Sequence, residues 1–440
     1  MQKIYLKCNE LPRCDVLVAG GGSAGVAAAV SAARSGAKTI LIEKNTFLGG
    51  LATGGLVTPM MKNALNAKKS LTKGIFLEIT KRLAKAGGGA RFKDGNPGWF
   101  NPEIYKIVLD EICTEAGIKL IFDSQIIRAN VKDKKIKDIV FFNKSGLFSI
   151  SAKEFIDATG DGDLMNLTGV SNEKGKKRQA ISLRFMMGGV DLKTLAGWLK
   201  KHDKTGDSPV YYLKTRDILL STAFTFEKAW ILKPFFDKAL KRGDLKKEDA
   251  AYFQIFSVPG AKDLIAFNCP RISLKGKVLD PLSYKDTTSA LLKGREMIKR
   301  ISSFCKKYLP GFKDAYISQI APALGVRESR RLVGQYVLTK EDILTRKKFA
   351  DAILSSNWPI DIHPSRRGGV TPPLRAPKNN YYQIPLRSLL PKTNEIKNLI
   401  VAGRCLSASF EAQSSARIQA NCIRMGEAAG LLAAKRVKRK

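Results

Sequence analysis

Histidine is scarce in this 440-residue chain, which contains only His202 and His363. Cysteine is also poorly placed for metal binding or cross-linking, because the seven cysteines form no CxxC pair and their number is odd. Structural zinc ions are usually held by paired thiols together with imidazoles, so the composition argues against a zinc site and against a disulfide framework. We therefore expect no metal, and we interpret the cysteines as scattered buried thiols in a reducing compartment.

Long apolar runs are missing as well. No stretch approaches the roughly 18–20 apolar residues that a membrane helix needs. Residues 1–13 carry charges at Lys3, Lys7 and Glu10 and lack the apolar core of a secretion signal. We expect a cytoplasmic protein with no membrane partner. A composition of 44% hydrophobic and 26% charged residues is typical of a globular protein with room for two or three domains.

Acidic residues are few compared with basic ones. The chain has 76 lysines and arginines against 39 aspartates and glutamates, a net charge of +37. Such a charge can serve nucleic acid or anionic substrates. The basic residues, however, are spread along the whole chain, and no aromatic-plus-basic RNA-binding motif occurs. We interpret most of the charge as a lysine-rich surface that faces solvent. The second interpretation is that the charge attracts an anionic small-molecule substrate. Nucleic acid is the least favoured partner, and homo-oligomerisation stays open.

Residues 14–20 are a short apolar run that leads into Gly20-Gly-Gly22-Ser23-Ala24-Gly25 and then a small-residue segment ending at Gly36. This order predicts a buried parallel strand, a glycine turn and a helix. Gly20 makes the tight turn, Gly22 lets a pyrophosphate approach the backbone, and Gly25 lets the helix pack against the strand. The helix start at Ser23 and Ala24 would then point its amides and positive dipole end at phosphates.

Glu43 ends a second predicted strand over residues 38–43, 18 residues beyond Gly25. Its carboxylate can accept hydrogen bonds from both hydroxyls of a ribose. A lone GxGxxG is a weak signal, but the frame of strand, turn, helix, strand and acid is a strong one. The acid also disfavours a 2′-phosphate, and hence NADP.

A second glycine-rich stretch follows the acid directly. An NAD-dependent enzyme does not need it, whereas a longer cofactor needs close backbone approach beyond the first helix. The stretch therefore favours FAD, with contacts from Lys44, Gly49, Gly50, Leu51, Ala52 and Thr53. Two further strands run into glycine turns, one at Ala158-Thr159-Gly160 and one at Gly403-Arg404, the latter before a long alanine-rich helix through Ala434. Ile126 is a further predicted contact. No second GxGxxG is present, so no separate nicotinamide domain is indicated.

These segments together resemble the FAD-dependent oxidoreductase family, within the glutathione-reductase-like flavoproteins that share a two-dinucleotide fold. The resemblance spans nearly the whole chain, and the segments Gly325-Val-Arg-Glu-Ser-Arg330 and Ile384-Pro-Leu-Arg-Ser388 are particular to the family. It implies an α/β fold in which a Rossmann-like parallel sheet binds FAD and an inserted α+β domain binds substrate. It also implies that a helix start faces the flavin pyrimidine, with Gly403, Arg404, Arg417, Ile418 and Gln419 close to the ring. The family usually has a histidine where this chain has Phe410.

The FAD-binding domain is expected to be discontinuous. We predict that it comprises residues 1–62, 101–170 and 385–440. Residues 171–384 would form the substrate or cap domain, and residues 63–100 an inserted loop and helix near the flavin. Predicted helices cover 101–117, 226–242 and 284–308, and predicted strands cover 119–122, 125–131, 136–143, 149–157, 181–190, 251–258 and 264–268. Residues 359–377, with Arg366-Arg-Gly-Gly369, are predicted to form an ordered loop.

Three residues are candidates for a role in catalysis or substrate binding. His363 is the better placed of the two histidines. Arg327 and Arg330 would share a face if their segment were helical and could then clamp a substrate carboxylate. The alternative is a salt-bridge network that joins the domains.

The expected activity is hydride transfer between a small organic substrate and the flavin, with oxidation of CH–OH or CH–CH groups favoured. Reduction of an unsaturated anionic acid is the second hypothesis, and a tRNA-modifying flavoprotein or a structural use of FAD are further ones. The electron acceptor stays open.

Overall fold

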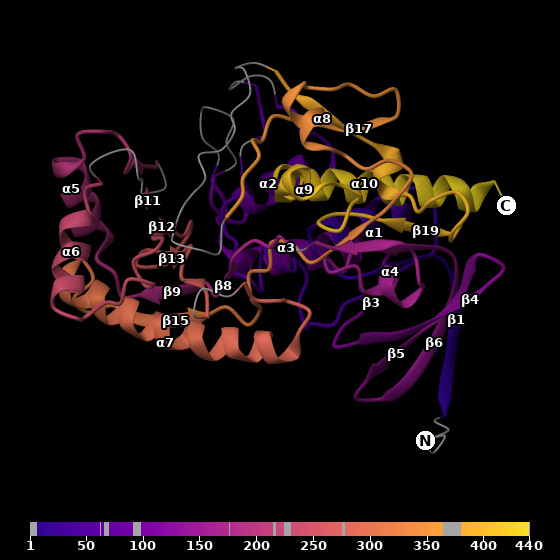
Figure 1. Cartoon of the computed structure of the whole chain (residues 1–440), viewed down its shortest axis with the longest axis horizontal. Coiled ribbons are helices and arrows are strands. Elements are labelled where there is room, and N and C mark those ends of the chain that lie inside the picture. The colour runs from indigo at the N-terminus through magenta and orange to yellow at the C-terminus, as the bar shows by residue number, and fades with distance from the viewer. Residues whose placement is uncertain are drawn as a thin grey trace.

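A computed structural model describes residues 7–439 except 62, 66–69, 91–97, 176, 214–216, 224–229, 275–277 and 364–379. The predicted loop at Arg366-Arg-Gly-Gly369 therefore lies outside the described residues. Two large sheets dominate the fold, and Figure 1 shows them in separate parts of the molecule. The chain enters the first sheet, builds the second one, and returns to the first through its last strand and helix.

The first sheet is a Rossmann-like sheet. Its strands lie in the order β3-β2-β1-β6-β5-β4, with β19 also paired to β6. The pairs among β1, β2, β3, β6 and β19 are parallel, whereas β4 and β5 form an antiparallel extension. Residues 16–19 of β1 and all of β2 are buried, as expected for strands covered on both faces. The predicted α/β class is thus confirmed. The strands are β1 (Cys8–Ala19), β2 (Thr39–Ile42), β3 (Lys119–Ile121), β4 (Gln125–Lys132), β5 (Lys135–Asn143), β6 (Gly146–Asp157) and β19 (Leu399–Val401).

Helices α1 (Ser23–Arg34) and α10 (Gln419–Lys438) pack together although they lie at opposite ends of the chain. Small residues make this approach close. A Cβ atom at Gly426 would lie 2.0 Å from the carbonyl oxygen of Ala24, and one at Gly430 would lie 2.1 Å from that of Ala28. The contact fixes the starts of both helices relative to the same edge of the sheet.

The second sheet is antiparallel and has the order β10-β11-β12-β13-β9-β15. Its aromatic core includes Phe185 stacked on Phe267 at a centroid distance of 4.2 Å. Helices α5, α6 and α7 lie with it on the left of Figure 1. The elements are β9 (Phe185–Gly188), β10 (Val210–Tyr212), β11 (Ile218–Ala223), β12 (Gln254–Ser257), β13 (Ile265–Phe267), β15 (Tyr316–Ile320), α5 (Leu192–His202), α6 (Lys233–Lys241) and α7 (Tyr284–Tyr308).

The remaining elements lie outside the two large sheets. They are α2 (Ile75–Lys85), α3 (Pro102–Glu115), α4 (Asp163–Leu167), α8 (Lys340–Leu344), α9 (Phe410–Ala416), η1 (Leu386–Leu389), β7 (Asn172–Lys174), β8 (Ile181–Ser182), β14 (Arg271–Ile272), β16 (Arg330–Leu332), β17 (Ala352–Ser356) and β18 (Tyr382–Pro385). The small sheets pair β14 with β8, β16 with β7 and β17 with β18.

Two sequence predictions need correction. The long helix predicted through Ala434 is found as α10, and a short helix, α9, precedes it, with an extended backbone at Ile418 (φ −61°, ψ 148°) between the two. The strand predicted over 181–190 is split into β8 and β9. The described part of the helix predicted from residue 226 begins only at Lys233, with a proline in its first turn. By contrast, the helix predicted over 284–308 is found with those bounds.

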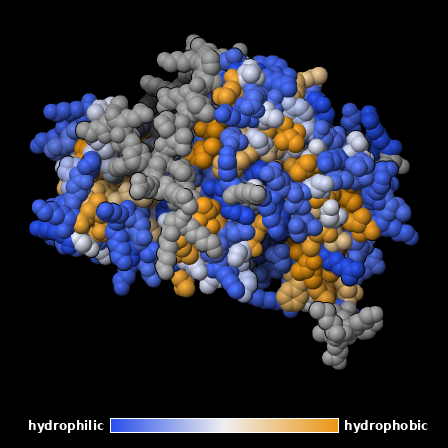
Figure 2. Space-filling model, viewed as in Figure 1, coloured by the Kyte–Doolittle hydropathy of each residue, from blue (hydrophilic) through white to orange (hydrophobic). Residues whose placement is uncertain are grey.

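No helix in the described ranges is long and apolar enough to cross a membrane. The face in Figure 2 is mostly hydrophilic, and its hydrophobic residues are scattered in small groups.

Candidate active site

A groove with a cavity of about 490 Å³ runs past the ends of the parallel strands and the starts of α1 and α10. Ligands of open α/β sheets bind at this edge, outside the carboxyl ends of the strands. Most of the predicted cofactor contacts come together there. The lining includes Gly20, Gly22, Ser23, Ala24, Glu43, Lys44, Gly50, Leu51, Ala52, Ile126, Ala158, Thr159, Gly160, Gly403, Arg404, Arg417 and Gln419.

Four predicted contacts lie behind the groove wall instead. A Cβ atom at Gly25 would lie 1.7 Å from the carbonyl oxygen of Gly20, so this glycine allows α1 to pack against β1. The amide of Gly49 donates to the Gly21 carbonyl (2.8 Å), and the hydroxyl of Thr53 donates to the Leu48 carbonyl (2.5 Å). Ile418 is a buried N-cap residue. We infer that these residues shape the glycine turns rather than contact a ligand.

The start of α1 suits an anionic group. Gly22 is its N-cap residue, no side chain caps the helix, and its first turn contains no acidic residue. A Cβ atom at Gly22 would come no closer than 3.9 Å to the Cα atom of Gly50, so this side of the turn faces the open groove. Free amides at a helix start with an uncompensated dipole bind phosphate groups, and the arrangement fits the pyrophosphate of FAD.

Glu43 is held rigidly at the end of β2. Its side chain is buried, and Oε2 accepts from the Gly21 amide (2.5 Å). Oε1 accepts from the backbone amide (2.8 Å) and the side-chain amide (2.5 Å) of Asn45. A carboxylate fixed in this way at the groove fits a ribose diol.

The start of α10 is a second uncapped helix N-terminus on the groove. Its N-cap Ile418 contributes no side-chain cap, and the first turn has no acidic residue. Gln419 donates through Nε2 to the Val57 carbonyl (2.7 Å), which leaves its buried Oε1 without a partner in the described part of the chain. The positive end of this helix and an unpaired amide oxygen fit the polar edge of an isoalloxazine ring.

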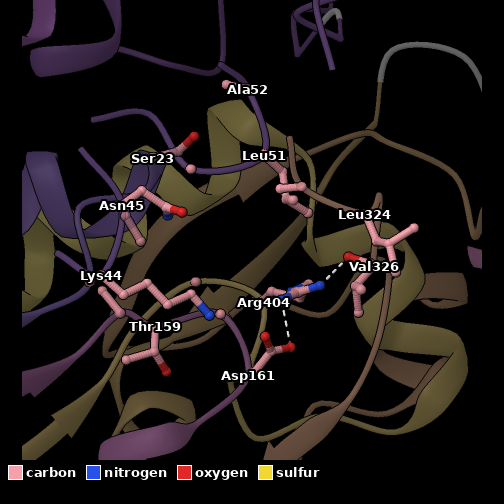
Figure 3. Close-up of a pocket in the computed structure, with 18 of the residues that line it drawn as sticks. Ser23, Lys44, Asn45, Leu51, Ala52, Thr159, Asp161, Leu324, Val326 and Arg404 are labelled. Carbon is pink, nitrogen blue, oxygen red and sulfur yellow. Dashed lines mark hydrogen bonds and ion pairs between the residues drawn. The ribbon is translucent and has the colours of Figure 1, made fainter. Parts of the chain in front are cut away.

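Arg404 ties the two halves of the groove together, as Figure 3 shows. Its guanidinium donates to Asp161 Oδ1 (2.8 Å) and to the Val326 carbonyl. Burial acts against the charged form of Asp161, but the Arg404 charge and the Ser329 hydrogen bond lower the pKa of this carboxyl. The arrangement fastens the turn after β6 to the loop before β16.

The sequence did not predict several of the residues that line the groove. Asp161 and Asp163 directly follow the predicted glycine turn after β6, but no motif marks them as cofactor contacts. The other lining residues without a predicted contact come from loops and from β2, β4, β8, α7 and α10, which the fold brings to the groove. They are Ile42, Asn45, Val57, Ser124, Gln125, Ser182, Arg184, Pro281, Thr287, Leu291, Pro322, Ala323, Leu324, Gly325, Val326, Ala402 and Cys422.

The two arginines of the family-specific segment do not form a clamp. The segment is not helical, since Arg330 begins strand β16. Arg327 lines the groove and donates to the Ala180 carbonyl (2.5 Å), whereas Arg330 donates to the Asp161 carbonyl (3.0 Å) and to Asp163 (3.1 Å). Arg330 therefore matches the salt-bridge alternative. Glu328 pairs with neither of them.

His363 is partly buried between two charged groups and does not line the groove. Its Nδ1 lies 2.8 Å from Arg271 Nη2, which can only donate, so Nδ1 accepts and the ring proton sits on Nε2. Nε2 lies 3.3 Å from Asp361 Oδ2. Burial and then the Arg327 charge lower the pKa of His363 to about 3, so the ring is neutral at physiological pH. Both nitrogens are engaged, which favours a positioning role over the predicted catalytic one.

Two residues near Gly403 also do not line the groove. Phe410 is the half-buried first residue of α9 and is not part of the lining. Cys405 is buried, and burial raises the pKa of its thiol well above the ordinary value. Neither is placed for flavin chemistry.

The sequence of the chain matches the model of the FAD dependent oxidoreductase family over residues 15–440. Thiamine thiazole synthase from Methanococcus vannielii is 30% identical over 162 residues, 34% of this chain and 58% of that protein. A fumarate reductase (cytochrome) from Shewanella frigidimarina is 58% identical over 45 residues, 10% of this chain and 8% of that protein. The chain thus spans a little more than half the length of the first relative and a small part of the second.

Solved flavoprotein structures cover almost the whole chain at low identity. A flavoprotein/dehydrogenase from Cytophaga hutchinsonii has 13% identity and a TM-score of 0.49, and covers 98% of this chain and 80% of its own. A geranylgeranyl bacteriochlorophyll reductase-like protein from Thermoplasma acidophilum has 14% identity and a TM-score of 0.47, with 98% and 79% covered. The assignment rests on the family match and on the groove. The chain belongs to the FAD-dependent oxidoreductase family, and it is an enzyme whose cofactor is FAD.

Proposed function

We propose that this enzyme transfers a hydride between a small organic substrate and N5 of the flavin, as a dehydrogenase of CH–OH or CH–CH groups. Bound FAD supplies the hydride-carrying chemistry. The residues of the chain then have to hold the ring, orient the substrate against it and keep water away.

The observation that carries this proposal is the composite wall of the groove. One wall consists of the glycine turns and the start of α10. The opposite wall consists of Ser182, Arg184, the loop 322–327 and, on α7, Thr287 and Leu291. In the sequence, all of these residues lie between the segments that form the first sheet. We therefore propose residues 171–384 as the substrate domain and residues 1–62, 101–170 and 385–440 as the FAD domain.

The apolar residues of the wall support a closed reaction space. Leu51 and Val57 lie on the cofactor side, and Leu324 and Val326 face them from the substrate side. Figure 3 shows Leu51, Leu324 and Val326 in the same pocket. A wall of this kind would limit water around the reacting carbon.

Anaerobic half-reactions test the proposal. The FAD-loaded protein is mixed with a panel of alcohols, hydroxy acids and saturated acids, and the loss of visible flavin absorbance is followed. We expect one chemical class to bleach the flavin with a rate that saturates with concentration. The photoreduced protein is then mixed with the unsaturated counterparts. A flavin that no saturated compound reduces and no unsaturated compound reoxidises would contradict hydride transfer to a small organic molecule.

A second candidate is a reductase of an unsaturated anionic acid. It is favoured by Arg184, Arg327 and Arg417, which line the groove beside the start of α10. Photoreduced enzyme would then be reoxidised faster by an α,β-unsaturated carboxylic acid than by its uncharged amide. Equal rates with the acid and the amide would remove this candidate.

A further inference from the structure

Four arginines gather at the substrate side of the groove. Arg184, Arg327 and Arg417 line it, and Arg271 lies behind them, stacked on the ring of Tyr252 at 3.7 Å from guanidinium carbon to ring centroid. Arg184 is 6% exposed, Arg271 7% and Arg327 9%. We refer to Arg184, Arg271, Arg327 and Arg417 as the arginine cluster.

The guanidinium groups act on one another. Burial lowers the pKa of all four, that of Arg184 to about 10. The charges of other members lower the pKa of Arg184, Arg327 and Arg417 further, whereas Tyr252 and Asp361 partly offset the effect of burial on Arg271. Such a cluster is costly to hold in a folded protein without counter-charges.

The protein supplies little counter-charge. Among the described residues, Asp361 is the one carboxylate that forms an ion pair with the arginine cluster, at 3.9 Å from Arg417 Nη2. Asp361 is also shared with His363, which is neutral. Burial opposes the charge on Asp361, but the hydrogen bond from His363 and the arginine charges lower its pKa, so it stays ionised. One carboxylate therefore faces four guanidinium groups.

The unpartnered atoms of the cluster are all donors. Within the described residues, no acceptor meets Nε of Arg184, Nε and Nη1 of Arg271, or Nε of Arg417. Nε2 of Gln179 is also unpartnered, while its Oε1 accepts from Arg417 Nη2 (3.3 Å). A buried donor without an acceptor destabilises the folded protein. The chemistry that this site lacks is a set of negatively charged oxygen acceptors.

The anionic part of the cofactor fits another place in the groove. The pyrophosphate fits the uncapped start of α1, and the start of α10 offers its positive end to the ring. Both of these sites use backbone amides. The arginine cluster consists of side chains from four separate segments, and of these only Arg417 is also a predicted contact of the flavin ring.

We propose that the arginine cluster is the carboxylate-binding subsite of the active site, and that the substrate is a small organic acid. Arg184, Arg327 and Arg417 contact the carboxylate, because guanidinium groups bind its two oxygens in a planar, bidentate manner. Arg271, His363 and Asp361 are positioning residues, since His363 links Arg271 to the carboxylate that holds Arg417. The place of this acid in a hydride transfer rests on the function proposed above, whereas the binding of a carboxylate does not.

The test uses the FAD-loaded enzyme and malonate as a probe, with chloride at matched ionic strength as the reference. Malonate should raise the Tm, and titration calorimetry should give a saturable Kd. Arg184→Met removes one guanidinium but keeps the length of the side chain. We expect it to weaken malonate binding about tenfold or more, because a hydrogen bond to a charged group is lost. It should also raise the Tm without malonate, because mutual repulsion in the cluster falls.

Arg346→Met is the matched control. Arg346 is 7% exposed and has unpartnered Nε and Nη1 atoms, but it does not line the groove. If the burial of guanidinium donors without acceptors were enough to explain the results, both variants would behave alike. The proposal requires the malonate response to change in Arg184→Met and to persist in Arg346→Met.

Three outcomes would overturn the proposal: no stabilisation by malonate beyond that of chloride, equal loss of the response in both variants, or tighter binding of sulfate or phosphate than of any carboxylate. The last result would point to a phosphorylated or sulfated substrate. Failure of the hydride-transfer function is separable, because malonate would then still bind while no substrate bleached the flavin. Conversely, flavin reduction by uncharged substrates at rates unaffected by Arg184→Met would keep the function and remove the subsite.

Discussion

The two ends of the groove offer different kinds of groups to an anion. The cofactor end uses backbone amides at the start of α1 and a single carboxylate, Glu43, whose two oxygens are fixed by amides. The substrate end uses buried side-chain cations that come from distant parts of the chain. The first arrangement can stay intact without a ligand, because its polar groups are exposed to the groove or already bonded. The second contains buried donors with no acceptor, so it depends on its ligand.

The difference predicts where each end is fragile. The cofactor end depends on the absence of side chains at a few glycines, and any added atom is harmful there. The substrate end depends on balance between charges, so that removing a charge can stabilise the empty protein and impair binding. The experiments below separate these two kinds of dependence.

The largest effect is expected from Gly25→Ala. The added Cβ atom would lie 1.7 Å from the Gly20 carbonyl oxygen, a backbone atom that cannot move without displacing β1 from α1. We expect destabilisation on the order of 5 kcal/mol, the upper end for single substitutions, and loss of folded protein. Gly22→Ala, with 3.9 Å to its nearest neighbour, should fold normally and bind FAD more weakly.

Expression yield, thermal melting and bound flavin distinguish these outcomes. Gly197→Ala in α5 is the control for glycine substitution in a helix, since a Cβ atom there meets nothing within 4 Å. Its stability should be unchanged or higher. A stable, yellow Gly25→Ala protein would show that the packing interpretation of this glycine is wrong.

The same contrast explains which parts of the site could be predicted from the sequence. At the cofactor end, backbone amides at tight turns would bind the ligand. Such turns need glycine at fixed positions within a few neighbouring residues, so short sequence motifs predict them. Gly20, Gly22 and Glu43 could therefore be assigned from spacing alone. Helices with a strongly periodic pattern of apolar residues could also be predicted, such as the helix over 284–308.

The substrate end could be predicted only in part, because its residues lie at positions 184, 271, 327 and 417, far apart in the sequence. Arg327 and Arg417 are both predicted site residues, but the sequence does not place them in one cluster. The prediction paired Arg327 with Arg330 because the two are close in sequence. The segment instead passes into β16, so Arg330 turns toward Asp163. Arg184 and Arg271 stand in no motif, and burial of an arginine cannot be inferred from local spacing.

The next largest effect concerns acid stability at the substrate end. His363 has a pKa of about 3 in the folded protein, compared with about 6.5 in the unfolded chain. Below pH 6.5 the unfolded chain therefore binds a proton that the folded protein does not, so stability falls as the pH drops from about 6.5 toward 3. The full loss is on the order of 4 kcal/mol. Denaturant unfolding at several pH values should show this decline.

His363→Asn should flatten that decline, because asparagine can accept from Arg271 and does not titrate. The control is His202→Asn, since His202 is exposed and stacks on Trp198 at 4.6 Å. Wild-type and His202→Asn proteins should share one pH profile. If His363→Asn followed it as well, His363 would not be the group that titrates.

A moderate effect is expected from Glu43→Gln at the cofactor end. The amide keeps the size of the side chain, but its NH2 group cannot accept a hydrogen bond, so either Gly21 or Asn45 loses its acceptor. The change weakens a charge-assisted contact to the ribose, and we expect the Kd for FAD to rise about tenfold. Flavin fluorescence during titration of the apoprotein measures it. Asp15→Asn, which alters a carboxylate bonded to the Lys38 amide (3.0 Å) outside the groove, should leave the Kd unchanged.

The smallest effect is expected from Phe410→His, which introduces the imidazole that the family usually has. Position 410 is the first residue of α9, next to its N-cap Ser409, and it does not line the groove. An imidazole there would be kept neutral by the positive end of the helix and, at a position that does not line the groove, would not reach the reacting carbon. Flavin reduction should therefore stay within about twofold of the wild-type rate, with the same pH profile. A tenfold acceleration or a new ionisation in the profile would mean that the groove extends to α9 during turnover, and that this end of the site uses proton transfer in addition to charge balance.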